Sequence, residues 1–210
     1  MIQHHKMNSP EYEHPFIGVS GPLGIGKTTT ARLIADNFGY HLLEEQPERN
    51  PFVALATKDP ARWAFASEVK FLMLGYDQNK EAQEIRKGSG VVDDVPIMQD
   101  VYSYGRAKLK GDQWRTFHNL YQSLEPQFMK PSLIVCLQAR TGEIMRRIRD
   151  RDRDYEQKIK PINIMYLTLL NYLWIWKSRI PTVYIQTDHL DVVHHENAKK
   201  RMMDMIQKRL

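Results

Sequence analysis

The chain has very little cysteine, and its histidines are poorly placed for metal binding. Cys136 is its single cysteine, so neither a disulfide framework nor a cysteine-based zinc site can form within the chain. Of the eight histidines, three lie in the N-terminal segment, and His194 and His195 are adjacent rather than one helical turn apart. We therefore expect a cytoplasmic protein without a histidine or cysteine metal site.

A long hydrophobic run is also missing. The N-terminal segment MIQHHKMNSPEYEHP is polar and has no apolar core of the kind that a secretory signal requires. We expect residues 1–15 to form a flexible tail ahead of a single domain over residues 16–210. The most apolar stretch, residues 162–176, contains two asparagines and one threonine and is shorter than the roughly 20 residues of a membrane span. This stretch predicts a helix of the core or of a dimer interface.

The excess of basic residues is too local to indicate a nucleic-acid partner. The formal net charge is +5, and a basic surface attracts phosphates. However, the excess is concentrated in residues 140–153, which hold six arginines, and in the C-terminal KKRMMDMIQKR. The first segment indicates a local function, and the second is typical of a solvated helix face. We expect no nucleic-acid polymer and no membrane among the partners.

Short apolar runs alternate with helical stretches along the chain. We predict strands at residues 16–20, 40–48, 91–92, 131–139 and 181–188, with helical segments between them and after the last one. Such alternation implies right-handed crossovers and a parallel sheet covered on both faces. We therefore expect an α/β fold with a five-stranded parallel sheet, in which ligands bind at the carboxyl ends of the strands.

A glycine-rich loop lies between the first predicted strand and a helix. It reads G-x-x-x-x-G-K-T, a P-loop whose glycines let the backbone wrap a phosphate, while Lys27 reaches the outer phosphates and the Thr28 hydroxyl ligates magnesium. This loop predicts a site for ATP and Mg²⁺. Its predicted nucleotide-binding residues are Gly21, Pro22, Leu23, Gly24, Ile25, Gly26, Lys27, Thr28 and Thr29. The N-K-x-D motif of a GTPase has no match, since the nearest candidates, TKDP and DVPI, differ from the GTPase motifs.

Pairs of acidic residues close the second and third predicted strands. Asp94, after the third strand, is placed to hold magnesium with Thr28, directly or through water. Glu45, after the second strand, faces the same edge of the sheet, where a carboxylate can take the proton of an acceptor hydroxyl. We predict that Glu45, Lys27, Asp94 and Arg147 are catalytic. The alternative is that these carboxylates are solvated loop residues.

An arginine-rich segment lies between the fourth and fifth predicted strands. Arg147, Arg151 and Arg153 can converge on one loop as a lid, where guanidinium groups stabilise the charge of a transferring phosphoryl group and exclude water. The interspersed aspartates support a simpler alternative, a solvated helix of alternating charge. We favour the lid because of its place in a P-loop fold.

The order of these motifs resembles the deoxynucleoside kinase family over almost the whole chain, from residue 16 to about residue 191. EQPERNP at residues 45–51 is similar to the family's E-P-V-x-x-N-P segment, and RIRDRDR at residues 147–153, with Glu156, looks like its lid. The resemblance implies a kinase that transfers the γ-phosphoryl group of ATP to the 5′-hydroxyl of a (deoxy)nucleoside or nucleoside-like acceptor, with Glu45 as the base. It also implies a homodimer and a contact from Glu156 to the acceptor.

Two positions depart from that family. Val95 stands where the family has an arginine that contacts the acceptor, and Glu68 stands where it has a glutamine that hydrogen-bonds the nucleobase. An ionised carboxylate accepts but does not donate, so Glu68 favours a base edge rich in N–H donors, such as guanine N1 and N2. We weigh an active kinase with a changed acceptor, in which Arg106 or another cation replaces the lost arginine, against a catalytically weakened homologue that binds ATP as a regulatory or partner subunit. The retained P-loop, acidic and lid residues favour the kinase.

Aromatic residues supply the remaining candidates. Trp63 can line an acceptor pocket, as can Tyr102 and Arg106 after the third strand, although ordinary packing accounts for Trp63 equally well. Trp174 and Trp176, in the apolar stretch, are more typical of core or subunit contacts than of a base-stacking platform.

Overall fold

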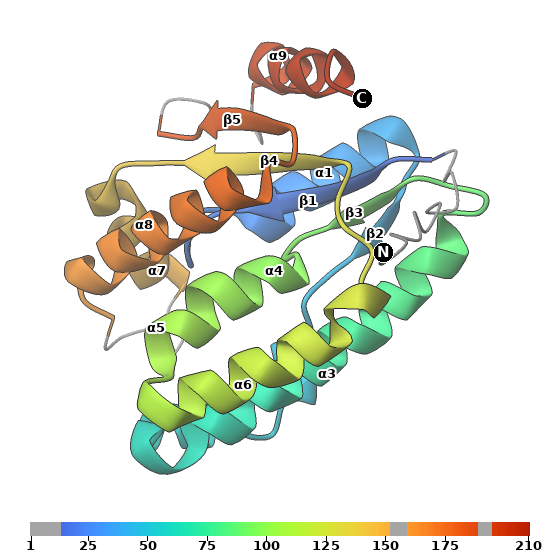
Figure 1. The fold of residues 1–210 in the computed structure, drawn as a ribbon. Coiled ribbons are helices and arrows are strands. Elements are labelled where there is room, and N and C mark those ends of the chain that lie inside the picture. The colour runs from blue at the N-terminus through green and yellow to red at the C-terminus, as the bar shows by residue number, and fades with distance from the viewer. Residues whose placement is uncertain (1–13, 152–158, 189–194) are drawn as a thin grey trace.

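The computed structural model describes residues 14–151, 159–188 and 195–210. Within these residues, five parallel strands form one sheet in the order β2-β3-β1-β4-β5 (Figure 1). The strands are β1 (Phe16–Ser20), β2 (His41–Leu43), β3 (Val91–Asp93), β4 (Leu133–Gln138) and β5 (Thr182–Gln186). The predicted α/β fold with a five-stranded parallel sheet is confirmed.

Helices connect the strands. The longer helices are α1 (Lys27–Phe38), α3 (Pro60–Ile85), α6 (Gly111–Leu124), α7 (Thr141–Arg151), α8 (Pro161–Ser178) and α9 (Glu196–Gln207). The shorter ones are α2 (Val53–Lys58), α4 (Ile97–Gln99) and α5 (Arg106–Lys108), with 3₁₀ turns η1 (Pro47–Arg49) and η3 (Glu125–Gln127). A π-helix, η2 (Asp100–Gly105), continues α4 and leads into α5.

Single residues explain where two of the helices begin and end. Gly39 follows α1 with φ 66°, a left-handed conformation that glycine adopts without strain, and its N–H bonds to the carbonyl oxygen of Ala35. At the start of α3, the Asp59 side chain accepts a hydrogen bond of 3.2 Å from the Arg62 N–H, and Pro60 occupies the first turn. Gly39 thus ends α1, and Asp59 with Pro60 begins α3.

The strands bury side chains on both faces of the sheet, as β4 shows most clearly. Leu133, Val135 and Leu137 belong to one hydrophobic cluster, whereas Ile134 and Cys136 belong to another. Because successive side chains of a strand point to opposite faces, these two clusters lie on the two sides of the sheet. A continuous apolar run in the sequence is therefore what a strand covered on both sides requires.

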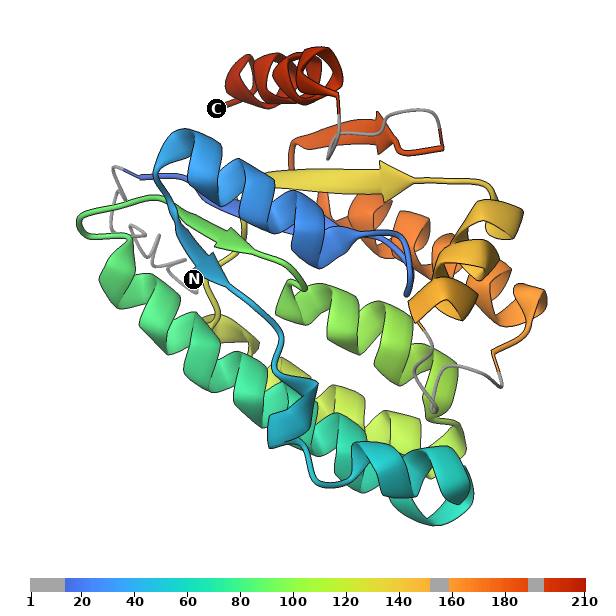
Figure 2. The same ribbon diagram turned by 180° about the vertical axis from the view of Figure 1, so that it is seen from behind.

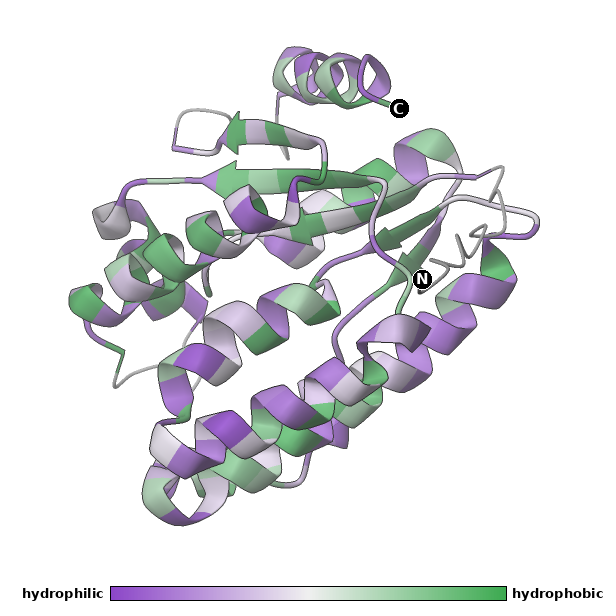
Figure 3. Cartoon of the chain, in the orientation of Figure 1, coloured by the Kyte–Doolittle hydropathy of each residue, from purple (hydrophilic) through white to green (hydrophobic). Residues whose placement is uncertain are grey.

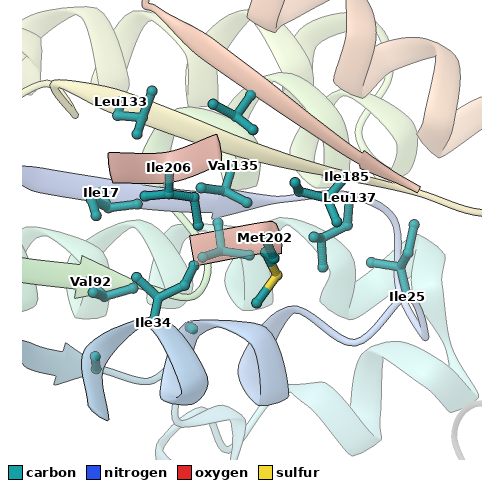
Figure 4. Close-up of a cluster of buried hydrophobic side chains, with 14 of the residues drawn as sticks. Ile17, Ile25, Ile34, Val92, Leu133, Val135, Leu137, Ile185, Met202 and Ile206 are labelled. Atoms are coloured by element: carbon teal, nitrogen blue, oxygen red, sulfur yellow. The ribbon is translucent and has the colours of Figure 1, made fainter. Parts of the chain in front are cut away.

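The first cluster joins the sheet to α1, α7 and α9. Ile34 of α1, Ile148 of α7 and Met202 of α9 are buried with Ile17 and Val135 of the strands. Figure 4 shows Ile34 and Met202 close to the strand residues of this cluster. Figure 2 shows α1 lying across this face of the sheet. The helix that carries the end of the P-loop is thereby held against the central strand.

The second cluster joins the opposite face to α3, η2, α6 and α8. Leu72, Val101, Phe117 and Trp174, one from each of these elements, are buried in it together. Helices α3 and α6 run side by side in both views (Figures 1 and 2). Hydrophobic residues accordingly concentrate on the central strands and on inward-facing helix positions (Figure 3). This packing fixes η2 and α5 relative to the strand ends.

Helix α8 has both a buried and an exposed apolar face. Trp174 is 4% exposed and belongs to the core, whereas Trp176 is 76% exposed. One face of this helix therefore packs in the core, the first of the two predicted alternatives, and the dimer interface stays a prediction for the other face. In the part of the chain that the structure describes, no helix is long and apolar enough to cross a membrane.

Two local features were not anticipated by the sequence pattern. The strand predicted at residues 40–48 ends at Leu43, and the chain then forms η1 and α2 before α3. The helical segment after β3 contains the π-helical turn η2. A π-helical turn widens the helix by one residue and leaves no signature in composition, although such turns are frequent at functional sites. Here it carries Asp100 and Tyr104.

Cys136 is expected to be unreactive in the folded protein. Its side chain is fully buried, and burial raises the pKa of the thiol to about 12, so very little thiolate is present near pH 8. We expect a disulfide reagent such as DTNB to label the folded chain at least roughly a hundredfold more slowly than the chain unfolded in guanidinium. Fast labelling of the folded protein would contradict the packing of β4 against α8.

Candidate active site

The P-loop joins β1 to α1 and depends on its glycines. Gly21, Gly24 and Gly26 have φ angles of 152°, 79° and 104°, which L side chains rarely adopt. A Cβ atom on Gly24 would also lie 2.5 Å from Ile148 Cγ1. The glycines thus permit a tight loop at the N-terminus of α1, where unpaired backbone N–H groups and the helix dipole attract an anion.

Lys27 carries a buried positive charge at the base of this loop. The residue is 9% exposed, and its Nζ donates to the Tyr104 hydroxyl at 3.1 Å and to the Pro22 carbonyl oxygen at 3.3 Å. Burial opposes the charge, but Tyr104, Glu45 and Asp94 together raise the pKa of Lys27 above its ordinary value. The lysine therefore remains an ammonium group directed at the acidic side of the site.

Asp94 links the P-loop to the end of β2. Thr28 Oγ1 donates to Asp94 Oδ2 at 2.5 Å, and the Glu45 N–H donates to Asp94 Oδ1 at 2.7 Å. Burial raises the pKa of Asp94, while these two hydrogen bonds act in the opposite direction. Neighbouring Asp93 accepts from the Val95 N–H at 3.0 Å, and burial raises its pKa to about 7. Of the two aspartates, Asp94 is therefore the one that meets the P-loop.

These residues fit a magnesium ion that is shared with phosphate groups. Among the described residues, no cluster of three or more His, Cys, Asp or Glu side chains forms a closed metal site. The Thr28 hydroxyl and the Asp94 carboxylate instead offer adjacent oxygen atoms. Mg²⁺ prefers oxygen ligands and is commonly held by one or two protein groups together with phosphates and water. The predicted pair of metal ligands is thus brought together.

A second group of acidic residues, Glu45, Asp100 and Glu68, lies near Lys27. Burial raises the pKa of Glu45, and the charges of Lys27 and Lys108 counteract that rise. Asp100 is half-buried, and its pKa is raised well above the ordinary value, first by removal from water and then by Glu45 and Glu68. The three carboxylates are therefore near enough to affect one another. Glu44 pairs instead with Arg32 on the surface, so only Glu45 of that acidic pair faces the site.

Lys108 is the cation of this second group. Its Nζ donates to Glu68 Oε1 at 2.7 Å, and the Glu68 side chain is only 2% exposed. The same Nζ lies 5.8 Å from the ring centres of Phe71 and Tyr104. Glu68, Glu45 and Asp100 all raise the pKa of Lys108, against the effect of burial. The site thus has two lysines, one at the P-loop and one beside Glu68.

A small cavity lies next to Glu45. The cavity is lined by Val95, the position at which the resemblance predicts an arginine, and by residues of α3 and of the segment after β2. The lining residues are Glu45, Gln46, Arg49, Phe71, Leu74, Gly75, Gln78, Val95 and Asp100. Val95 therefore faces the predicted acceptor side, and it contributes no charge there.

Three predicted acceptor residues lie in contact with other parts of the chain. Trp63 stacks on Phe52, with ring centres 5.8 Å apart. Tyr102 packs edge-on against His118 and Tyr121, and the exposed Arg106 lies over the Trp114 ring at 5.4 Å; these three partners belong to α6. The structure brings Lys108, rather than Arg106, to Glu68.

Arg147 lies against the outside of the P-loop. Its guanidinium group donates to the Ile25 carbonyl oxygen at 2.9 Å, to the Thr187 carbonyl oxygen at 2.8 Å and to Glu143 Oε1 at 2.8 Å. Contact with a phosphate would require it to exchange some of these bonds. Arg151 is the last residue of α7. The predicted lid residues Arg153 and Glu156 lie outside the described part of the chain.

The sequence patterns considered above did not single out Asp100, Tyr104 and Lys108 as a group. They are spaced four residues apart, and they lie on the segment that follows the predicted magnesium aspartate. Residues at this spacing share one face of a helix. That spacing, together with the known place of ligands beyond the carboxyl ends of strands, was the available signal.

Comparison with known proteins agrees with this geometry. The family model for deoxynucleoside kinase matches residues 17–210. A deoxyguanosine kinase of Bacillus subtilis is 30% identical over 148 residues, which cover 70% of this chain and 71% of that protein. The deoxyadenosine/deoxycytidine kinase of the same organism is 24% identical over 204 residues, covering 92% of each chain.

A solved structure shows the same fold. The deoxyadenosine kinase from M. mycoides with bound dATP superposes with a TM-score of 0.76 at 21% sequence identity, covering 92% of this chain and 100% of that one. The matched region runs from β1 through α9. It therefore includes every strand of the sheet and every described group of the site. The chain belongs to the deoxynucleoside kinase family, whose members are phosphotransferases that act on an alcohol group.

Proposed function

We propose that this protein transfers the γ-phosphoryl group of ATP to the 5′-hydroxyl of a deoxynucleoside. The observation that carries the proposal is the meeting of Lys27, the Thr28–Asp94 pair and Glu45 at one edge of the sheet. Phosphoryl transfer needs a phosphate cradle, a place for magnesium and a group that orients the acceptor. Each of these needs has a residue here, which favours the kinase over a weakened regulatory homologue.

Each residue has a definite task in this proposal. Lys27 compensates the negative charge of the outer phosphates, and Thr28 and Asp94 hold magnesium. Bound Mg²⁺ would neutralise phosphate charge and favour the in-line geometry. Glu45 accepts the proton of the acceptor hydroxyl, and the burial that raises its pKa makes the carboxylate a stronger base. Arg147 supports the loop through the Ile25 carbonyl oxygen.

A transfer assay with labelled ATP and a panel of deoxynucleosides tests the proposal. Changing Lys27→Ala, or removing Mg²⁺ with EDTA, should abolish transfer, because the phosphates lose their compensating charge.

Glu45→Gln should lower kcat by roughly 10²–10⁴ with little change in ATP binding. The matched control is Glu81→Gln, an exposed carboxylate of α3, which should behave like wild type. Tight ATP binding without transfer to any acceptor would support the regulatory alternative instead.

We further propose that Glu68 and Lys108 together select the acceptor base. One oxygen of Glu68 binds Lys108, so the pair retains an acceptor oxygen and ammonium donors. An ionised carboxylate favours acidic N–H donors, and an ammonium group favours a carbonyl oxygen. A 6-oxopurine such as guanine places these groups side by side. The rings of Phe71 and Tyr104 near Lys108 supply an apolar surface for a planar base.

Charge-neutral variants of the pair test this selection. Lys108→Met alone leaves the Glu68 charge buried without its partner. Because the Lys108 side chain is 46% exposed and water partly screens the pair, this change should destabilise the fold by roughly 1–3 kcal/mol. The double variant Glu68→Gln, Lys108→Met removes both charges, so it should recover stability while losing the preference for deoxyguanosine over deoxyadenosine. Urea unfolding and kcat/KM for both nucleosides measure the two effects. An unchanged preference in the double variant would show that the pair is structural.

We also propose that two copies of the chain associate through α8. The exposed apolar residues of this helix recur at intervals of three or four and form one stripe: Ile162, Met165, Leu169, Leu173 and Trp176. A continuous apolar stripe on a helix is typical of an interface with another helix. The homodimer implied by the family resemblance provides an occupant that would cover this stripe.

The mass of the protein in solution tests the dimer. We expect light scattering to give twice the chain mass for the wild type at about 10 μM, a concentration at which an interface of micromolar or better affinity is largely occupied. Leu169→Glu should give the monomer mass, because a charge would be buried in the interface. The control is Met205→Glu on α9, where the side chain is 45% exposed, and it should remain dimeric. A monomeric wild type would exclude the proposal.

A further inference from the structure

Gln99 holds the first glycine of the P-loop by both of its backbone groups. Gln99 Oε1 accepts a hydrogen bond from the Gly21 N–H at 3.0 Å, and Gln99 Nε2 donates to the Gly21 carbonyl oxygen at 2.9 Å. The glutamine is only 1% exposed. This bond pair is buried, and both bonds depend on a single side-chain amide.

The need for this contact follows from where the sheet ends. The β1–β3 pairing stops at Gly18 opposite Asp93, and the β1–β4 pairing stops at Ser20 opposite Cys136. Gly21 therefore lies just beyond the ladder, where buried backbone groups still require partners. A side-chain amide both donates and accepts, so Gln99 supplies the next pair of bonds. An acid or a hydrocarbon at this position cannot do so.

The same amide connects the loop to the acceptor side. Gln99 Nε2 lies 3.4 Å from the Tyr104 hydroxyl, which accepts from Lys27 Nζ at 3.1 Å. The Ser20 hydroxyl lies within hydrogen-bond distance of Gln99 Oε1, at 2.5 Å. Asp100 is the next residue in the chain. The segment from Gln99 to Tyr104 therefore contacts Gly21 at the start of the P-loop. It also carries Tyr104, the hydrogen-bond partner of Lys27, and Asp100 on the proposed acceptor side.

We propose that Gln99 is a positioning residue that sets the P-loop for the nucleotide triphosphate and keeps it in register with the helical turn that carries Asp100. The proposal rests on the proposed function, since it takes the P-loop as the ATP site. Gln99 touches neither reactant in this scheme. It acts through Gly21, whose φ of 152° leaves no other residue type able to take its place without strain.

The chain contains a matched control for this contact. Asn79 of α3 is 7% exposed and pairs in the same way with Met129, accepting from its N–H at 2.9 Å and donating to its carbonyl oxygen at 3.2 Å. This pair joins α3 to the segment before β4 and contacts none of the P-loop residues. Each amide also has side-chain partners, Ser20 and Tyr104 for Gln99 and Gln83 for Asn79. Loss of either amide removes an equivalent pair of backbone bonds, so that part of the cost to folding is comparable.

The experiment compares Gln99→Glu and Gln99→Met with Asn79→Asp and Asn79→Leu. Thermal unfolding records the structural cost, and calorimetric titration with Mg²⁺ and a non-hydrolysable ATP analogue records binding. We expect all four variants to melt at lower temperature than wild type. Only the Gln99 variants should lose affinity for the analogue, by roughly tenfold, the effect of about one buried hydrogen bond. In turnover, KM for ATP should rise more than KM for the acceptor.

The outcomes separate this inference from the proposed function. Equal losses of affinity in the Gln99 and Asn79 variants, or no loss in either, would overturn the positioning role. A wild type that binds the analogue in a Gln99-dependent way but phosphorylates no deoxynucleoside would contradict the kinase proposal and leave the role of Gln99 supported. Gln99→Glu retains the size of the side chain and one of the two bonds, so it provides a folded variant if Gln99→Met does not fold.

Discussion

The ammonium group of Lys27 is largely buried, and the other groups of the site compensate its positive charge. A buried charge is stable only where hydrogen bonds and opposite charges replace the water that it has lost. Tyr104 and the Pro22 carbonyl oxygen supply the hydrogen bonds, while Glu45 and Asp94 supply the opposite charge. These partners come from different segments of the chain. They meet only because β1, β2 and β3 are adjacent in one parallel sheet.

The acceptor side repeats this arrangement around a second lysine. Glu68, buried in α3, would be strongly unfavourable without Lys108. The loss of positive charge at Val95 is thus accompanied by a positive charge on α5, within reach of Glu45 and Asp100. In the proposed scheme the acceptor meets a lysine on a flexible stem, which offers a point charge, whereas an arginine would offer a planar set of donors.

The fold supports the site through its two hydrophobic layers. The cluster that contains Ile34 and Ile148 holds α1 and α7 around the P-loop, and the cluster that contains Val101 and Trp174 holds η2 against α8. Donor-side and acceptor-side groups are therefore attached to opposite layers of one sheet. Contacts that cross between the layers at the strand ends, such as the pair formed by Gln99 and Gly21, connect the two halves of the site.

The sequence by itself determined the succession of strands and helices along the chain, the P-loop and the acidic residues that follow β2 and close β3. These features depend on local patterns: apolar runs, glycines that permit positive φ, and charged residues at strand ends. It also determined that Glu45 and Asp94 lie at one edge, because parallel strands end on the same side of a sheet. The family resemblance agreed with these assignments.

Only the tertiary structure decided which cation pairs with Glu68 and which aromatic residue reaches Lys27. Arg106 and Lys108 are two residues apart, so they point to different sides of the chain, and packing against α6 and α3 assigns Arg106 to Trp114 and Lys108 to Glu68. In the same way, Tyr102 packs against α6, whereas Tyr104 accepts a hydrogen bond from Lys27. Such choices depend on contacts between distant segments and on a π-helical turn, and neither is encoded in local periodicity.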